Sequence, residues 1–443
     1  MAGIALASQL AHEDIRVALL ESGGDEQDPE TAALNEGELT GIPYFPLTET
    51  RVRCLGGASS HWGGWCGPLD PEDFEQQSWV SLSGWPFKKE ELDPYYGLAH
   101  DFLRLPRDGY SVEEWHRRVS LPVLALEKTR VSTILHHVCG PLNVGSYYRS
   151  MFEGSENVTF YLNSTVLRFH VSADGRRVAA ADVATPSDSG TKLYARQFVL
   201  AAGGIENPRL LLLSGIGNHT VGRFFMEHPH VGIGEIGGIP EDVDLRFYQE
   251  CVYEDPGPRR RGCLVAALQI LKDTRTAERL SNAKLFVETP APAATTAQLT
   301  AVWEQEPNWN SYISLSDSQD RFGRRLPRLH WELSSQDWWT ISRSAEIFAD
   351  ALREAQLGKV NLSSTAPSIL TPAIRGGHHH LGTTRMSSSA SAGVVDQFCR
   401  VHEVDNLFVA GGSVFPTAGQ ATPTLTITAL AFRLAKHLSG FKH

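Results

Sequence analysis

Three adjacent histidines, His378, His379 and His380, begin the segment HHHLGTTRM and could do chemistry in two ways. The first is metal binding, but consecutive side chains alternate between the faces of an extended chain and fan around a helix, so one triplet rarely supplies convergent ligands. The second is general-base catalysis, because a neutral imidazole with an ordinary pKa of about 6.5 can remove a proton from a hydroxyl group. The segment favours a base, and we predict no metal site.

Thr422 and Pro423 stand at the start of the last predicted helix. The preceding run LFVAGG predicts a buried strand that ends in the turn Gly411–Gly412. We expect the helix to begin at Pro423 with Thr422 as its N-cap, and its apolar face repeats at helical spacing, with Ile427, Leu430, Leu434 and Leu438. The Thr422 hydroxyl could also bind a substrate oxygen.

A glycine-rich segment, RCLGGASSHWGGWCGPLDPEDF at 53–74, holds two embedded tryptophans, Trp62 and Trp65. Such a loop can bring backbone N–H groups against a phosphate or an aromatic ring that side chains would obstruct. A tight turn with core tryptophans is the alternative interpretation.

The first residues predict a helix, AGIALASQLAH at 2–12, followed by a buried strand, IRVALL at 15–20. This order is the second half of a βαβ unit. Gly3 would be the third glycine of a dinucleotide fingerprint, and Glu21 the acid that binds a ribose hydroxyl. The strand and the two glycines expected before Gly3 are not in the sequence. We therefore expect the 443-residue polypeptide to bind its nucleotide poorly, which recovery of a stoichiometric cofactor would contradict.

Three further segments predict local structure. RQFVLAAGG at 196–204 predicts a strand ending in Gly203 and Gly204, and Pro208 can begin the helix that follows. TPAPAATTAQLT at 289–300 is typical of a surface loop. DRFGRRLPRLHWEL at 320–333 predicts a hairpin followed by a strand.

Together these segments resemble the glucose–methanol–choline (GMC) family of FAD-dependent oxidoreductases, over nearly all of the chain. The family pattern of a histidine followed by Gly-Thr and Arg-Met fits only His379. The resemblance implies that His379 is the general base and that His378 and His380 pack or hydrogen-bond beside it. Thr422 departs from the family, which usually carries Asn or His there as a second catalytic residue. We therefore expect altered or weakened alcohol oxidation.

The resemblance implies FAD as the cofactor. The stretch around His61 is similar to the flavin-contacting segment of the family and especially to pyranose 2-oxidases, in which this histidine carries the flavin covalently. A covalent bond at His61 is a hypothesis that release of the flavin by acid precipitation would exclude. Val166 resembles the position whose backbone meets the adenine. The predicted cofactor-binding residues are Gly3, Glu21, Gly56, Gly57, Ser60, His61, Trp62, Val166, Gly203, Gly411, Gly412, Pro423 and Thr424.

The implied fold is mixed α/β and α+β. A Rossmann-like FAD-binding domain, truncated at its N-terminus, would comprise residues 1–70, 155–225 and 375–443. A sheet-and-helix substrate-binding domain would comprise residues 71–154 and 226–374.

The composition narrows the possible partners. Forty basic against 51 acidic residues leave a net charge of −11, which argues against nucleic acid because phosphate binding needs a concentrated basic surface. Six scattered cysteines without a CxxC pair suggest free thiols rather than a zinc site or a disulfide framework. We expect no membrane span, since the charge-free stretch 407–432 is rich in Pro, Gly and Thr, and we expect a cytoplasmic protein.

The resemblance implies oxidation of an alcohol, with substrates tilted toward sugars, glycosides or polyols. Hydride would pass to flavin N5 and the proton to His379, and the electrons would leave to oxygen, a quinone or another carrier. Two alternatives stay open: a flavin-containing lyase without redox chemistry, and a truncated, non-catalytic remnant. Anaerobic, substrate-dependent bleaching of the flavin would distinguish the first. The coding sequence upstream of Met1 would test the second.

Overall fold

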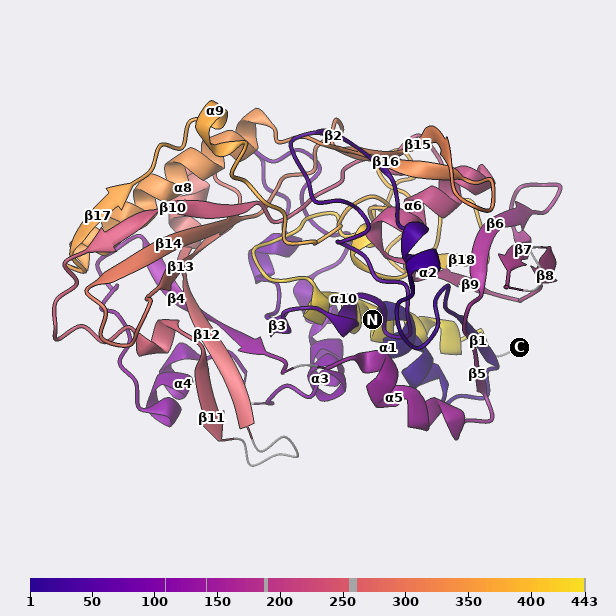
Figure 1. Ribbon diagram of the computed structural model, residues 1–443, viewed down its shortest axis with the longest axis horizontal. Helices are drawn as coiled ribbons and strands as arrows, with labels where there is room; N and C mark the ends of the chain where they lie inside the picture. The colour runs from indigo at the N-terminus through magenta and orange to yellow at the C-terminus, as the bar shows by residue number, and fades with distance from the viewer. Residues whose placement is uncertain (108, 141, 187–189, 255–260, 442–443) are drawn as a thin grey trace.

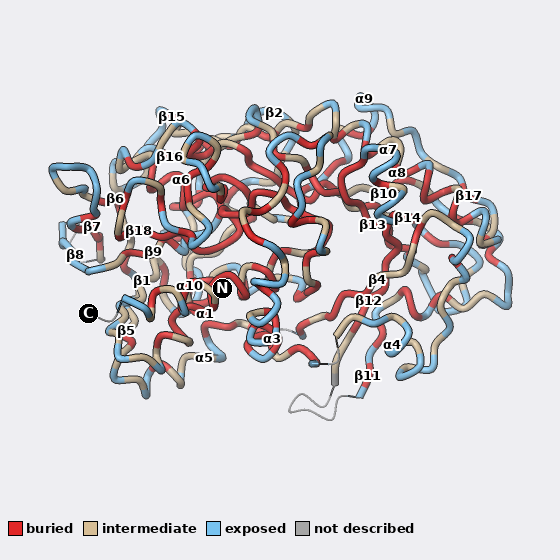
Figure 2. The backbone as a smooth tube through the Cα atoms, turned by 180° about the vertical axis from the view of Figure 1, so that it is seen from behind, coloured by how far each residue is buried: buried red, intermediate tan, exposed pale blue. Residues whose placement is uncertain are grey.

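A computed structural model describes residues 1–107, 109–140, 142–186, 190–254 and 261–441 (Figure 1). The chain forms two halves, with the N- and C-termini in the same half. Buried segments run through both halves (Figure 2) and form two large apolar cores. One core joins the first and last helices to the short parallel strands, and the other includes the buried side chains of the largest sheet.

The largest sheet has eight strands and fills one half of the molecule (Figure 1). All its strand pairs are antiparallel, and alternate residues of β14 are buried, as a sheet with one covered face requires. In spatial order the strands are β17 (Lys359–Leu362), β10 (His230–Gly237), β14 (Thr296–Trp303), β13 (Ala283–Glu288), β12 (Arg261–Ile270), β4 (Val131–Val138) and β3 (Trp65–Cys66), and β11 (Cys251–Glu254) pairs with β12.

The helix α8 (Ser335–Glu354) packs on this sheet. It begins with a capping box, in which the Ser334 hydroxyl accepts from the backbone N–H of Asp337 and the Asp337 carboxylate accepts from the N–H of Ser334. Strand β14 overturns part of the loop predicted at 289–300, because its residues pair with β10 from Thr296 onward and also with β13 from Gln298 onward.

The other half holds two separate parallel pairs of strands. The helix α1 (Ala2–Leu10) leads into β1 (Val17–Leu20), as predicted, and β1 pairs with β5 (Val158–Tyr161). The strand β9 (Phe198–Leu200) pairs with β18 (Leu407–Val409). Among the described residues, no strand pairs with the second edge of β1 or β9. The expectation that β1 is buried is therefore wrong: Ala18 is exposed and its strand neighbours are half-buried.

Two smaller sheets and the remaining helices complete the fold. The segment 320–333, predicted as a hairpin followed by a strand, supplies the turn and the second strand of a hairpin formed by β15 (Tyr312–Gln319) and β16 (Arg325–Trp331), and β2 (Glu38–Gly41) pairs with β16. The second small sheet contains β6 (Thr165–Val171), β7 (Val178–Ala184) and β8 (Thr191–Leu193). The other helices are α2 (Pro29–Ala33), α3 (Asp93–Phe102), α4 (Val112–Val119), α5 (Val144–Glu153), α6 (Gly203–Ser214), α7 (Lys272–Glu278), α9 (Pro367–Leu370) and α10 (Thr424–Ser439), with short 3₁₀ turns η1 (Gly57–Ser60), η2 (Pro71–Phe74), η3 (Lys89–Glu91), η4 (Arg246–Tyr248) and η5 (Gly412–Val414).

The last helix, α10, packs against both α1 and α3 and so connects the chain ends inside one core. Of the predicted apolar face it buries Leu430, Leu434 and Leu438, whereas Ile427 is half-buried. In the described part of the chain, no helix is both long and apolar enough to cross a membrane.

Candidate active site

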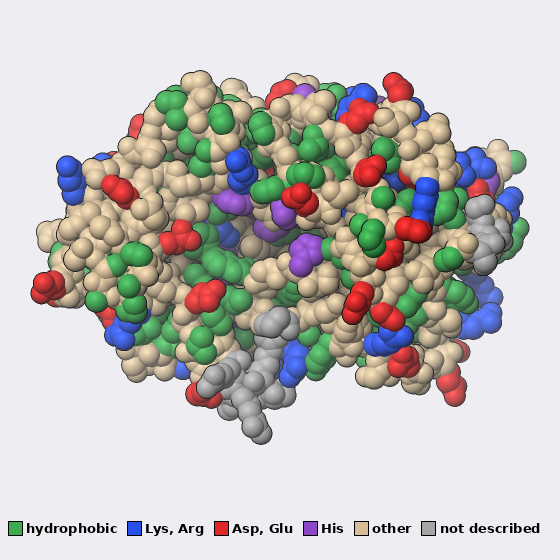
Figure 3. Space-filling view, viewed as in Figure 1, with side chains coloured by type: hydrophobic (Ala, Val, Ile, Leu, Met, Phe, Trp, Pro, Cys, Tyr) green, Lys and Arg blue, Asp and Glu red, His purple; other side chains and the backbone are tan. Residues whose placement is uncertain are grey.

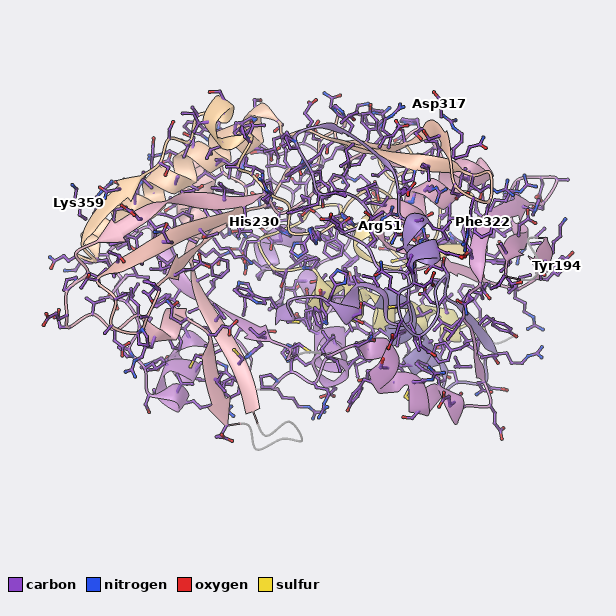
Figure 4. All side chains as sticks on the ribbon, viewed as in Figure 1. Arg51, Tyr194, His230, Asp317, Phe322 and Lys359 are labelled. Atoms are coloured by element: carbon purple, nitrogen blue, oxygen red, sulfur yellow. The ribbon has the colours of Figure 1, made fainter. Side chains whose placement is uncertain are left out.

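A cavity of about 1920 Å³ is lined by segments that are far apart in the sequence. They include α1 and β1, the glycine-rich loop, the turn after β9, the histidine segment and the start of α10. Figure 3 shows histidine side chains gathered around a hollow near the middle of one face, and Figure 4 shows Arg51, a lining residue, near the middle of the molecule. The predicted site residues that line the cavity are Gly3, Glu21, Gly56, Gly57, His61, Trp62, Val166, Gly203, His379, Gly411, Gly412, Thr422, Pro423 and Thr424.

Ser60 is the one predicted site residue that does not line the cavity. It ends the 3₁₀ turn η1, in which successive side chains point about 120° apart, so Ser60 is exposed while Ser59 faces inward. The Ser59 hydroxyl donates to the Gly56 carbonyl at 2.7 Å and accepts from the Val144 N–H at 3.2 Å. The inward serine of this loop is therefore Ser59.

The glycines around the cavity serve two different purposes. Gly56 has a φ of +103°, and a Cβ there would lie 2.2 Å from Asn143 Oδ1, so close packing against the cap of α5 requires glycine. Gly203 and Gly411 also have positive φ angles, of +88° and +119°, but no described residue beyond their chain neighbours and the local helix backbone has a heavy atom within 4 Å of a Cβ placed there. Their backbones face open space in the cavity, where a ligand could approach closely.

Asn207 ties the two turns at Gly203 and Gly411 together. Its side-chain oxygen accepts from the Ala202 N–H at 2.8 Å, and its nitrogen donates to the Ser413 hydroxyl at 2.9 Å.

The helix α6 begins at Gly203, whereas the sequence predicted that it would begin at Pro208. Pro208 leaves the carbonyl four residues earlier without its helical N–H donor, and the Thr383 hydroxyl donates to that oxygen at 2.5 Å.

Glu227 holds the backbone of the histidine segment. Its buried carboxylate accepts from the N–H groups of Gly377 at 2.9 Å and His379 at 3.0 Å, and from the hydroxyl of Tyr44. Burial raises the pKa of Glu227 to about 7, although these donors oppose the rise. The loop before His379 is thereby fixed to the strand-like segment that precedes β10.

The ring of His379 is fixed by a second histidine. His379 Nδ1 lies 2.8 Å from Nδ1 of His228, whose Nε2 lies 2.7 Å from the Gly419 carbonyl oxygen. Burial, with a smaller effect of Lys284, lowers the pKa of His228 to about 3. Burial also holds the pKa of His379 well below its ordinary value, with His228 and Lys284 acting in the same direction. Both rings are therefore neutral near pH 7.

His378 and His380 take separate partners, as predicted for neighbours that pack or hydrogen-bond. The ring of His378 meets Phe45 edge-on at a centroid distance of 4.7 Å. His380 Nε2 lies 3.1 Å from the Tyr44 hydroxyl, and burial lowers the pKa of His380 to about 3. The three rings of the triplet thus serve three different contacts.

Thr422 lines the cavity but does not cap α10. Its hydroxyl donates to the Trp65 carbonyl at 2.7 Å, and the helix begins at Thr424 with Pro423 as its N-cap. Both the predicted cap and the predicted first residue are therefore wrong, by one position. Among the residues that the structure describes, no side chain caps the N-terminus of α10, so no side-chain acceptor from them occupies the N–H groups of its first turn.

The sequence did not predict the ion-pair network that lies beside the cavity. Glu206 lies between three guanidinium groups, at 2.9 Å from Arg51, 3.0 Å from Arg53 and 2.7 Å from Arg209. Burial alone would raise its pKa, but the three arginines outweigh that effect and lower it to about 2. The pattern Arg-Val-Arg at 51–53 offered a weak signal, since alternate residues of an extended segment share a face.

His228, Glu227 and Lys284 were also missed as site residues. Only the Glu-His pair in MEHP hinted at chemistry, and no local spacing places it opposite a segment about 150 residues later. Lys284 is a fully buried lysine on β13, and burial lowers its pKa to about 7.

Comparison with known proteins gives consistent matches. The N-terminal family model described as GMC oxidoreductase matches residues 146–230, and the C-terminal model matches residues 307–431. The chain is 26% identical over 427 residues to C-glycoside 3-oxidase of Microbacterium trichothecenolyticum, covering 87% of this chain and 75% of that protein. It is 22% identical over 474 residues to pyranose 2-oxidase of Tricholoma matsutake, covering 92% and 77%.

A solved structure supports the same fold. The formate oxidase of Aspergillus oryzae RIB40, studied for modification of its FAD, superimposes with a TM-score of 0.62 at 17% identity, covering 100% of this chain and 96% of the other. This likeness confirms the predicted fold class, a mixed arrangement of helices and sheets.

Proposed function

The chain belongs to the GMC oxidoreductase family, whose members depend on FAD, and we propose that it binds FAD and oxidises an alcohol group of a sugar, glycoside or polyol. One observation carries the proposal. A neutral histidine, His379, lines the same cavity as the open glycine backbone at Gly203 and Gly411.

The residues present fit an FAD molecule. Open glycine turns allow close approach to a diphosphate or a ring, and the uncapped N-terminus of α10 offers N–H groups and a positive dipole end to an anionic group. Glu21 lies at the end of β1, where a carboxylate can accept from ribose hydroxyls. When bound, FAD supplies the acceptor for hydride.

The residues of the chain supply the proton chemistry. His379 accepts the proton of the substrate hydroxyl, and its neutral state at pH 7 keeps a lone pair available for that step. The Thr422 oxygen, which uses its hydrogen on the Trp65 carbonyl, keeps lone pairs that can accept from a substrate hydroxyl. Thr422 cannot take up a proton, so His379 is the base.

The substrate class rests on the relatives. C-glycoside 3-oxidase and pyranose 2-oxidase are named for oxidation of sugar rings, and this chain matches most of the length of each. A sugar is therefore the first substrate class to test. We propose oxygen, a quinone or another small carrier as the electron acceptor.

The test is anaerobic reduction of bound flavin. The purified protein is loaded with excess FAD, and bleaching near 450 nm is followed with a panel of monosaccharides, glycosides and polyols. We expect bleaching with at least one of them, and a rate about 100-fold or more lower in His379→Asn. His12→Asn, on an exposed residue outside the cavity, is the matched control and should keep the wild-type rate. Bound FAD that no member of the panel reduces would overturn the proposed redox function and favour a lyase.

Flavin attachment is tested separately. His61 lines the cavity and is exposed, so a covalent bond to flavin is sterically accessible there. Yellow colour that remains in the acid-precipitated protein and disappears in His61→Ala would establish the bond. Complete release of the flavin by acid would exclude it.

A further inference from the structure

Three groups lie in a row: the Gly419 carbonyl, the ring of His228 and the ring of His379, the candidate base. The carbonyl oxygen and His228 Nε2 are 2.7 Å apart, and the two Nδ1 atoms are 2.8 Å apart. Both distances are those of hydrogen bonds, so each gap holds one hydrogen.

The chemistry of the end group decides where the hydrogens are. A carbonyl oxygen can only accept, so His228 Nε2 must donate. His228 is buried and its pKa is about 3, so the ring is neutral and carries a single N–H. Its Nδ1 is then an acceptor, and the hydrogen between the two rings belongs to Nδ1 of His379.

We propose that the Gly419 carbonyl, acting through His228, fixes His379 as the Nδ1–H tautomer and leaves His379 Nε2 as the basic nitrogen that faces the cavity. His228 is a positioning residue, and its importance for catalysis rests on the proposed function of His379. Among the described residues, no protein hydrogen bond involves His379 Nε2, and His379 lines the cavity.

The end of the row is itself rigid. The N–H of Gly419 donates to the buried carboxylate of Glu304 at 2.7 Å. Gly419 has a φ of +65°, and a Cβ there would lie 2.4 Å from Leu69 Cδ2 and 2.6 Å from Asp73 Oδ2. The carbonyl that selects the tautomer therefore cannot turn away without a rearrangement of the loop that leads to Thr422.

The consequence for proton transfer is specific. The substrate O–H bond breaks and an N–H bond forms at His379 Nε2, giving an imidazolium whose Nδ1–H still donates to His228. A His379 ring with its hydrogen on Nε2 would present a donor to the substrate and could not take the proton. In a serine protease triad, loss of such tautomer control costs about 10⁴-fold in turnover.

Two substitutions divide the functions of the His228 ring. His228→Asn places a side-chain oxygen near the position of Nδ1 and keeps an acceptor for His379. His228→Gln places an amide nitrogen near the position of Nε2, so it keeps the bond to Gly419 but offers His379 no acceptor. We expect anaerobic flavin reduction to fall by about 10-fold in His228→Asn and by at least 100-fold in His228→Gln. Equal losses in the two variants would overturn the proposal.

NMR of protein labelled with ¹⁵N-histidine determines the tautomer of His379 without turnover or FAD. The His379 signals are those that are absent from the spectrum of His379→Gln. We expect wild-type His379 to show a protonated Nδ1 and an unprotonated Nε2, and His12→Asn to leave this pattern unchanged. Protonation of His379 Nε2 in the wild type would refute the proposed tautomer, whatever reaction the protein performs. Correct tautomer signals without any alcohol oxidation would refute only the proposed function.

Discussion

Thr422 is the residue at which the sequence was predicted to depart from the pattern of the GMC oxidoreductases. Its hydroxyl donates to the Trp65 carbonyl and therefore has no hydrogen left for a substrate oxygen. An asparagine at 422 could donate to both, because its amide carries two hydrogens. We expect Thr422→Asn to raise the rate of anaerobic flavin reduction on a true substrate by about 10-fold. Thr422→Val, which keeps the shape and loses the hydroxyl, is the matched comparison. An unchanged or lower rate in Thr422→Asn would count against a catalytic deficit at this position.

The raised pKa of Glu227 predicts how the stability of the folded protein depends on pH. Its pKa is about 7 in the folded protein against an ordinary 4.5, so the folded state binds the proton more tightly than the unfolded state. The stability linked to Glu227 is fully present below pH 4.5 and is lost as pH rises through about 7, by about 3 kcal/mol in total. Glu227→Gln removes this loss. Urea unfolding at pH 5 and pH 8 should show a smaller decrease in the variant than in the wild type.

The same variant tests the support of His379. A glutamine amide nitrogen would face the N–H of Gly377 or His379, so the loop should shift and flavin reduction should slow by up to about 100-fold. Glu241→Gln, on an exposed residue, is the control. Identical pH slopes of stability in wild type and Glu227→Gln would contradict the assignment of a raised pKa to this carboxylate.

At the scale of elements, the two short parallel pairs of strands have open edges. Within the described part of the chain, β1 and β9 each pair on one side only, and residues of both strands line the cavity. A parallel strand normally has a hydrogen-bonded neighbour and apolar cover on both faces. We therefore expect the 443-residue chain to bind FAD weakly. Fusing an apolar strand and a Gly-x-Gly turn ahead of Met1 should tighten binding by at least about 10-fold. Fluorescence titration with FAD measures this, with a Gly/Ser extension of equal length as the control. Equal affinities for the two extensions would contradict the prediction.

The elements that the sequence predicted well are those whose pattern is local. The helix at 2–10, the hairpin of β15 and β16 and the apolar face of α10 each follow from periodicity and turn residues. The predicted starts of α6 and α10 were wrong because tertiary hydrogen bonds intervene. The Thr383 hydroxyl donates to the carbonyl that Pro208 leaves without a helical donor, and the Thr422 hydroxyl donates to the Trp65 carbonyl instead of capping α10. The strand β14 was missed because its Ala/Thr composition resembles a loop, and only pairing with β10 and β13 makes it a strand.

At the scale of the whole molecule, the family resemblance predicted the fold class. Fourteen of the fifteen site residues that it implied line one cavity in the structure, with Ser60 the exception. It could not predict the residues that position them. His228 meets His379 across 151 residues and Gly419 across 191, and no local pattern encodes such contacts. The domain boundaries stay a prediction. The core around α10 also takes in residues such as Phe74, Phe102 and Phe152, which the predicted boundaries assign to the substrate domain.

A ligand that contacts segments near both ends and in the middle of the sequence should stabilise the folded protein. The cavity is lined by residues from α1 and β1, from the turn after β9 and from the start of α10, so FAD would contact segments that unfolding separates. At a concentration 100 times its dissociation constant, a ligand adds about 2.7 kcal/mol of stability. For a chain of 443 residues this corresponds to a rise in Tm of about 3 °C. Circular dichroism melts with and without FAD measure the shift. Riboflavin, which lacks the diphosphate and adenosine groups, should give a clearly smaller shift at the same concentration. An equal shift with riboflavin would mean that the turns at Gly203 and Gly411 do not hold the nucleotide part of FAD, and the cavity would then have to be reassigned to a smaller ligand.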